Sequence, residues 1–137
     1  MFITDLPKAL FPDAIALWQE AGLTRPWNDP EADLTRAMAG SSSTVLAGVN
    51  DTELLGTAMV GHDGHRGWVY YLAVRSAQQR RGLGRELMRA CEQWVADHGV
   101  PKIQLMVRQA NSDAISFYTS LGYQAGEVVV LGRSLTA

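Results

Sequence analysis

The spacing of apolar residues changes in the middle of the chain from that of a strand to that of a helix. Residues 68–74 are rich in β-branched and aromatic side chains, which favours a strand. From Leu83 to Val95 the apolar residues recur every three or four positions, which predicts an amphipathic helix. Gly82 and Gly84 lie at the junction, where glycine lets the backbone approach a ligand closely. The centre of the chain is therefore expected to form a strand, a glycine-containing loop and a helix.

The pattern on either side predicts more strands and helices in alternating groups. The expected elements are a brief strand at Phe2-Ile3, helices at Pro7–Ala21 and from Pro30 to Gly40, strands at Thr44–Val49 and Leu54–Gly61, a strand at Lys102–Val107, a helix at Ala114–Leu121 and a last strand at Val128–Leu131. Asp29 is expected to cap the second helix. This order predicts an α+β fold with a mixed sheet covered by helices.

Length and composition indicate one ordinary globular domain over residues 1–137. Twelve basic against fourteen acidic residues give a net charge of −2, which disfavours a general nucleic-acid-binding protein. There is no apolar run of about 18 residues, and Asp5 and Pro7 interrupt the start, so neither a membrane span nor a signal peptide is expected. The expected location is the cytoplasm.

Several kinds of chemistry lack the residues that they need. Cys91 is the single cysteine and falls on the apolar helical stripe, so we interpret it as a core residue. The three histidines lack His-Glu-x-x-His spacing, and no metal site is expected. No Gly-Lys pair or Gly-x-Ser-x-Gly elbow occurs, and Leu87 stands where a dinucleotide fingerprint requires its third glycine.

Five of the twelve basic residues fall between residues 75 and 89: Arg75, Arg80, Arg81, Arg85 and Arg89. The following helix would add free N–H groups and partial positive charge at the same place. This predicts a site for an anion such as a pyrophosphate. A basic turn that merely starts an exposed helix, and a small nucleic-acid-binding module, are the alternatives; a steep salt dependence would identify the latter.

Two blocks of sequence resemble the GNAT superfamily of N-acetyltransferases. Gln79-x-x-Gly82-x-Gly84 is similar to its acetyl-CoA motif, and the segment from Asn111 to Tyr123 is similar to its Asn-x-x-Ala-x-x-Phe-Tyr-x-x-x-Gly-Phe/Tyr signature. The segment Arg25–Pro30 also resembles small bacterial members. The resemblance implies a mixed, mostly antiparallel sheet flanked by helices, with a splayed cofactor cleft between the fourth and fifth strands. It also allows a homodimer.

The resemblance further implies roles for individual residues. Acetyl-CoA would be bound by Leu72, Ala73, Val74, Gln79, Arg80, Arg81, Gly82, Leu83, Gly84, Arg85 and Asn111. Backbone amides of the loop would hold the pyrophosphate, the strand would pair with the pantetheine arm, and Asn111 would bond that arm from the opposite side. Tyr118 matches the tyrosine that protonates the leaving thiolate. From its spacing alone, Tyr118 is also compatible with a core position beside Phe117 and Leu121.

The implied function is acetyl-CoA-dependent transfer of an acetyl group to a primary amine, by direct attack in a ternary complex that leaves CoA. The strand 68–74 contains no carboxylate, so the general base is left open among Glu53, Asp63, His62 and Asp29, each of which also fits a turn, cap or surface role. The alternative is a non-catalytic acyl-CoA-binding or regulatory module. A protein N-terminus, lysine, polyamine, antibiotic or small metabolite all fit as acceptor.

Overall fold

The computed structural model describes residues 1–136. The chain divides into two compact units, Met1–Met106 and Val107–Ala137. The N-terminal unit contains a sheet and the helices that cover it, and the C-terminal unit contains the helix α4 (Ser112–Ser120). A single domain over residues 1–137 stays a prediction. None of the helices within residues 1–136 combines the length and the apolar character needed to cross a membrane.

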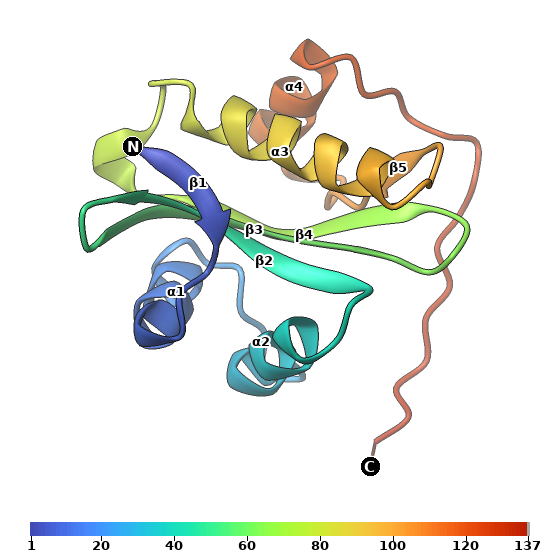
Figure 1. The fold of residues 1–137 in the computed structure, drawn as a ribbon. Coiled ribbons are helices and arrows are strands. Elements are labelled where there is room, and N and C mark those ends of the chain that lie inside the picture. The colour runs from blue at the N-terminus through green and yellow to red at the C-terminus, as the bar shows by residue number, and fades with distance from the viewer. Residues whose placement is uncertain (137) are drawn as a thin grey trace. The chain divides into compact units, whose positions relative to one another are not determined.

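The sheet of the N-terminal unit has five strands whose order in space follows their order in the chain (Figure 1). They are β1 (Phe2–Asp5), β2 (Ser43–Asn50), β3 (Glu53–His62), β4 (Gly67–Val74) and β5 (Ile103–Leu105). Neighbouring strands from β1 to β4 are antiparallel, whereas β5 is parallel to β4. This confirms the predicted mixed, mostly antiparallel sheet.

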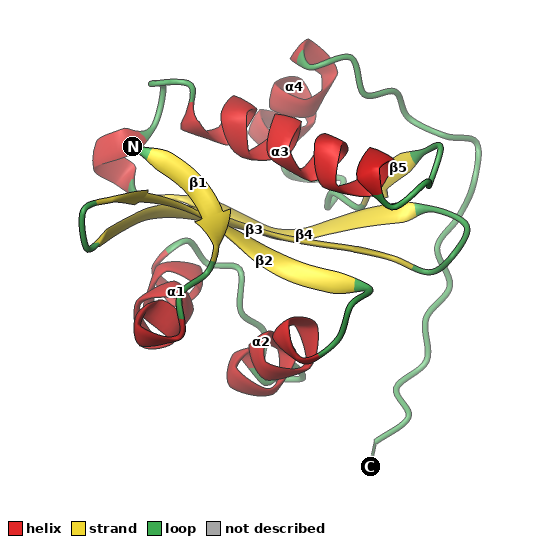
Figure 2. Ribbon diagram, viewed as in Figure 1, coloured by secondary structure: helices red, strands yellow, loops and turns green. Residues whose placement is uncertain are grey.

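Helices cover both faces of this sheet (Figure 2). The short 3-10 turn η1 (Lys8–Leu10), α1 (Phe11–Glu20) and α2 (Pro30–Ala39) lie on one face, and α3 (Leu83–Asp97) lies on the other. A second 3-10 turn, η2 (Ser76–Gln78), follows β4. The predicted apolar face of α3 is confirmed, since its residues Leu83, Leu87, Cys91 and Val95 are all buried.

Glycines in the sheet allow α3 to pack closely against it. A Cβ atom at Gly67 would lie 2.5 Å from Cγ2 of Val95, and one at Gly48 would lie 2.9 Å from Cδ1 of Leu83. Gly48 pairs with Gly56 across β2 and β3. The first residue of α3 therefore rests on a part of the sheet that has no side chains, which fixes where the helix begins.

Gly56→Ala is expected to destabilise the protein by about 1–3 kcal/mol, because the new Cβ would lie 2.9 Å from the Ala73 carbonyl oxygen and close to two leucines of α3. Gly40→Ala is the matched control, since a Cβ there meets nothing within 4 Å and the φ of −118° suits any residue. Urea denaturation of the two variants and the wild type measures the difference. Equal stability of all three proteins would contradict this account of the packing.

Three expected elements differ at their ends or are missing. The strand predicted at Val128–Leu131 is wrong: these residues form no strand, and their side chains are 62–90% exposed. A strand is stabilised by pairing, and an apolar run without a partner strand lacks that stabilisation. The strand expected at Lys102–Val107 is shortened to β5, and the first helix begins only at Phe11. The Asp29 cap is confirmed, with Oδ1 accepting from the backbone N–H groups of Glu31 and Ala32.

Candidate functional site

The fourth strand has a partner on only one side over its second half. The parallel ladder between β4 and β5 ends at the pair Val69–Leu105, whereas β4 continues to Val74. Within the N-terminal unit, the backbone of Tyr70–Val74 that faces away from β3 is therefore without a strand partner. We refer to this stretch as the free edge of β4. It corresponds to the splay between the fourth and fifth strands that the sequence resemblance implied.

A β-bulge lies in the same stretch of β4. Thr57 on β3 pairs with Ala73, but Met59 pairs with Tyr70, so one residue of β3 faces both Tyr71 and Leu72. Tyr71 has a φ of +52°, a left-handed conformation that costs a non-glycine residue roughly 1–2 kcal/mol. A bulge of this kind changes the direction in which the following backbone groups point.

Two backbone hydrogen bonds show the effect of the bulge. The N–H of Gly67 donates to Lys102 on the β5 side at 2.8 Å, whereas the N–H of Arg75 donates to Leu55 on β3 at 2.9 Å. Gly67 and Arg75 are an even number of residues apart, so in a regular strand both would face the same side. The bulge therefore turns the backbone groups of Leu72 and Val74 to the free edge, and those of Ala73 toward β3.

The loop after β4 ends in an uncapped helix N-terminus. Gly82 is the N-cap of α3 with a φ of +85°, and Arg80 is also left-handed with a φ of +64°. No side chain caps the helix, and among the described residues the N–H groups of residues 80–85 have no backbone acceptor. These N–H groups and the partial positive charge of the helix end favour an anion.

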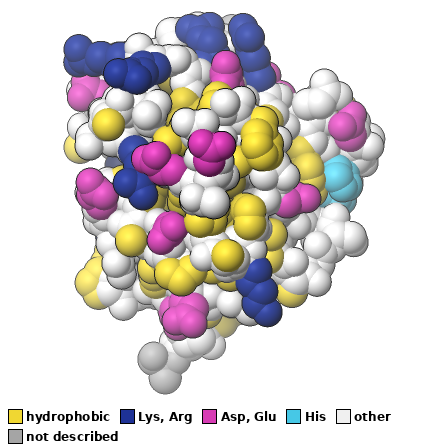
Figure 3. Space-filling model, turned by 60° about the vertical axis from the view of Figure 1, so that its left-hand side comes forward, with side chains coloured by type: hydrophobic (Ala, Val, Ile, Leu, Met, Phe, Trp, Pro, Cys, Tyr) yellow, Lys and Arg dark blue, Asp and Glu magenta, His cyan; other side chains and the backbone are white. Residues whose placement is uncertain are grey.

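The arginines predicted to surround this loop are all exposed: Arg75, Arg80, Arg81, Arg85 and Arg89. Arg75 is tied to the sheet, since its Nε donates to the Leu54 carbonyl oxygen at 2.6 Å. Figure 3 shows basic side chains gathered along one rim of the face in view, with carboxylates below them. The N-terminal unit thus joins an unpaired strand edge, suited to an extended polar chain, to a cationic helix end.

The other two predicted site residues belong to the C-terminal unit. Asn111 is the N-cap of α4, where its Oδ1 accepts from the Ala114 N–H at 3.1 Å. Tyr118 lies in α4, and its ring meets those of Phe117 and Tyr123 edge to face. The cap uses one acceptor position of the Asn111 side-chain oxygen and leaves the amide N–H groups for a ligand. The roles implied for Asn111 and Tyr118 stay predictions.

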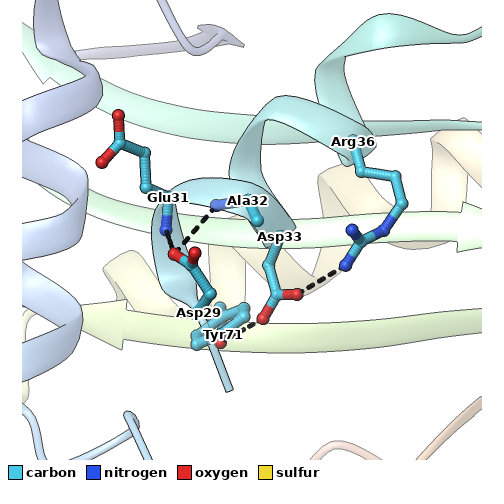
Figure 4. Close-up of polar contacts among 6 residues, drawn as sticks. All are labelled: Asp29, Glu31, Ala32, Asp33, Arg36 and Tyr71. Atoms are coloured by element: carbon cyan, nitrogen blue, oxygen red, sulfur yellow. Dashed lines mark hydrogen bonds and ion pairs between the residues drawn. The ribbon is translucent and has the colours of Figure 1, made fainter. Parts of the chain in front are cut away.

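Three of the four candidate bases have structural roles. Asp29 accepts the two cap hydrogen bonds described above (Figure 4). Asp63 accepts from the backbone N–H groups of His65 and Arg66, and these bonds lower its pKa to about 2. A carboxylate with so low a pKa is a weak base at neutral pH. Nδ1 of His62 accepts from the Gly64 N–H at 3.1 Å, and the His62 ring is tilted against those of His98 and Trp94. Glu53 begins β3.

Cys91 is confirmed as a core residue. Its side chain is fully buried, and burial raises the pKa of its thiol to about 12. A nucleophilic cysteine needs a lowered pKa and access to substrate. Within residues 1–136, no three or more His, Cys, Asp or Glu side chains are grouped so that they could hold a metal ion.

A buried polar cluster around the bulge was not predicted from the sequence. The Trp18 and Tyr71 rings stack with their centroids 4.0 Å apart, and Nε1 of Trp18 donates to the Thr57 hydroxyl at 2.8 Å. The Tyr71 hydroxyl donates to Asp33 at 2.9 Å, and Asp33 also pairs with Arg36 (Figure 4). Burial, followed by the Asp33 hydrogen bond, raises the pKa of Tyr71 to about 12, which keeps the hydroxyl protonated. The signal in the sequence was the pair Tyr70-Tyr71, because two adjacent large side chains break the alternation of inward- and outward-facing residues along a strand.

Solved structures with this fold include aminoglycoside N-acetyltransferases and a protein described as a transcriptional regulator. Aminoglycoside N-acetyltransferase AAC(6')-Iy, in complex with CoA, matches with a TM-score of 0.83 and 16% identity over 98% of this chain and 95% of that chain. AAC(6')-IG from Acinetobacter haemolyticus matches with a TM-score of 0.79 and 20% identity over 100% of both chains. A transcriptional regulator from Bacillus halodurans C-125 matches with a TM-score of 0.82 and 16% identity over 97% of this chain and 99% of that chain.

These likenesses show the fold, and a family model adds the relationship in sequence. The model described as the acetyltransferase (GNAT) family matches residues 11–123. The matched range runs from the start of α1 to just beyond α4 and contains both the free edge of β4 and the uncapped end of α3. The chain therefore belongs to the acetyltransferase (GNAT) family, whose members transfer acetyl groups from acetyl-CoA.

Proposed function

We propose that this protein is an N-acetyltransferase that moves the acetyl group of acetyl-CoA to a primary amine. The observation that carries the proposal is the direct connection between the free edge of β4 and the cationic N-terminus of α3. The pyrophosphate of the cofactor binds the amides of Arg80–Arg85, with Gln79 beside them. The pantetheine arm pairs with the Leu72 carbonyl oxygen and the backbone of Val74, as an added strand would, which leaves the Leu72 N–H for the thioester.

The reaction is direct attack in a ternary complex. The neutral amine nitrogen attacks the thioester carbonyl carbon, and the carbonyl oxygen becomes an oxyanion that accepts from a backbone N–H at the free edge. The tetrahedral intermediate then collapses, the C–S bond breaks, and the thiolate of CoA takes a proton. The attacking nitrogen releases its proton to solvent water, and the products are the acetylated amine and CoA.

Tyr118 supplies the proton to the thiolate in this proposal, and the Asn111 amide bonds the pantetheine arm. Both roles are supported by the match of these residues to the family signature. Proton transfer from a phenol with a pKa near 10 to a thiolate near 8.5 is uphill by about 2 kcal/mol, which fits within an enzymatic barrier.

The acceptor amine is expected to be one that deprotonates easily. β4 has no carboxylate, and Asp63 is held ionised by its turn. Neutralising an ordinary lysine at pH 7 costs about 4.6 kcal/mol, but an α-amine costs only about 1 kcal/mol. A panel of amines, assayed by release of free CoA, identifies the acceptor class.

Saturating CoA or acetyl-CoA is expected to stabilise the protein, because the ligand binds only the folded state. At about 100 times the dissociation constant, the gain is roughly 2.7 kcal/mol. Thermal melts with CoA, acetyl-CoA, ATP and NAD measure it, and the last two serve as controls for general phosphate binding. No shift with either CoA species would contradict the proposed function.

The second candidate is a non-catalytic module that binds acyl-CoA. The absence of a carboxylate from β4 favours it. Such a module would show the same stabilisation by CoA but would turn over no amine in the panel. The amine assay and the thermal melts together therefore separate the two functions.

A further inference from the structure

A chain of two hydrogen bonds, the first of them buried, leads from α1 to the bulge of β4. Nε1 of Trp18 donates to Oγ1 of Thr57 at 2.8 Å, and the same hydroxyl donates to the Tyr71 carbonyl oxygen at 3.1 Å. Trp18 and Thr57 are both fully buried. Because the Trp18 N–H can only donate, the Thr57 hydroxyl proton is directed to Tyr71.

The Tyr71 carbonyl belongs to the peptide unit that carries the Leu72 N–H. This peptide is trans, since the described chain has no cis peptide bond, so its C=O and N–H point in opposite directions. Thr57 holds the oxygen from the β3 side, and the Leu72 N–H consequently points to the free edge. A carbonyl that accepts a hydrogen bond also strengthens the N–H of its own peptide as a donor.

The side chain of Tyr71 is held from both helices on that face of the sheet. Its ring stacks on Trp18 of α1 at an interplanar angle of 13°, and its hydroxyl donates to Asp33 of α2 (Figure 4). Asp33 also forms a surface ion pair with Arg36 at 2.8 Å. These contacts stabilise a residue whose left-handed φ is unfavourable. The orientation of the Leu72 peptide therefore depends on side chains that do not lie on the free edge.

We propose that Thr57 and Tyr71 are positioning residues that hold the Leu72 N–H toward the thioester carbonyl oxygen of acetyl-CoA. This inference rests on the function proposed above, because it assumes that acetyl-CoA lies along the free edge. CoA has no acetyl carbonyl, so a misdirected Leu72 N–H weakens acetyl-CoA binding and leaves CoA binding nearly unchanged. The ratio of the two dissociation constants reports the orientation without any acceptor.

The test is calorimetric titration of the full chain with CoA and with acetyl-CoA. Thr57→Val removes the hydroxyl at nearly constant shape, and Tyr71→Phe removes the Asp33 bond but keeps the stacked ring. In both variants the preference for acetyl-CoA over CoA is expected to fall by roughly two- to tenfold, the range for one hydrogen bond. The carbonyl 13C resonance of bound [1-13C]acetyl-CoA is expected to move upfield from its wild-type position.

Two conservative variants complete the experiment. Thr57→Ser retains the hydroxyl and is expected to keep the wild-type ratio and resonance. Thr44→Val removes a second buried threonine hydroxyl, which donates to Asp5 on β1 at 2.7 Å, and is expected to keep the wild-type ratio and resonance as well. A lowered melting temperature with an unchanged ratio in Thr57→Val and Tyr71→Phe would show a purely structural role and overturn the proposal. A wild type that binds neither ligand would overturn the proposed function as well.

Discussion

Gly82→Glu is expected to abolish CoA binding while the protein stays folded. Gly82 is the N-cap of α3, and a Cβ there meets nothing within 4 Å, so the new side chain fits without a clash. The carboxylate would place a negative charge where the cofactor pyrophosphate is proposed to bind. Repulsion between the two anions and the added bulk should weaken the affinity by at least about 100-fold, which calorimetric titration measures.

The β3–β4 turn offers a matched control. Gly64 has the same φ of +85° and the same open surroundings, so Gly64→Glu introduces equal strain and equal charge at the opposite end of β4. This variant should bind CoA as the wild type does. If Gly82→Glu binds CoA equally well in a folded, soluble preparation, the loop is not the phosphate site.

Tyr118→Phe is expected to lower kcat by at least roughly tenfold. The substitution keeps the ring and removes the proton that it would deliver to the thiolate, and acid catalysis contributes about 10² to 10⁴ in rate. CoA affinity should change far less, because a ground-state hydrogen bond of the hydroxyl contributes only about 0.5–1.5 kcal/mol. Steady-state kinetics with an acceptor from the amine panel gives kcat, and titration on the same preparation gives the affinity.

Tyr123→Phe is the comparison for this experiment. Tyr123 also carries a phenol, and its ring centroid lies 5.9 Å from that of Tyr118. This variant should retain most of the wild-type kcat. Equal kcat values for Tyr118→Phe and the wild type would reduce Tyr118 to a packing residue. They would also require another source for the proton.

The sequence predicted the elements that have a strong local signal. The stripe of α3, the strands β2 and β3, and the Asp29 cap all follow from periodicity or capping chemistry, which act over a few residues. The loop at Gly82 was predicted for the same reason, because glycines, arginines and a helix start are adjacent in the chain. Asn111 and Tyr118 depended on the family signature, and no local pattern singled them out.

The sequence did not predict the features that depend on partners distant in the chain. The bulge at Tyr71 lies in the pairing of β4 with β3, and Tyr71 contacts Thr57, Trp18 and Asp33, none of which is near it in sequence. The apolar run at Val128–Leu131 has strong strand propensity but no strand partner in the described chain. Propensity is a weak guide where pairing decides the outcome.

The bulge in β4 also bears on how such a site changes during evolution. Its donors are main-chain N–H groups, whose directions depend on the count of residues between Gly67 and Arg75 and, at Leu72, on the contacts of Tyr71. Loss or gain of one residue would exchange the inward and outward groups at every later position. The length of β4 and its residues Gly67 and Tyr71 are therefore expected to change less in a lineage than the other side chains of the strand.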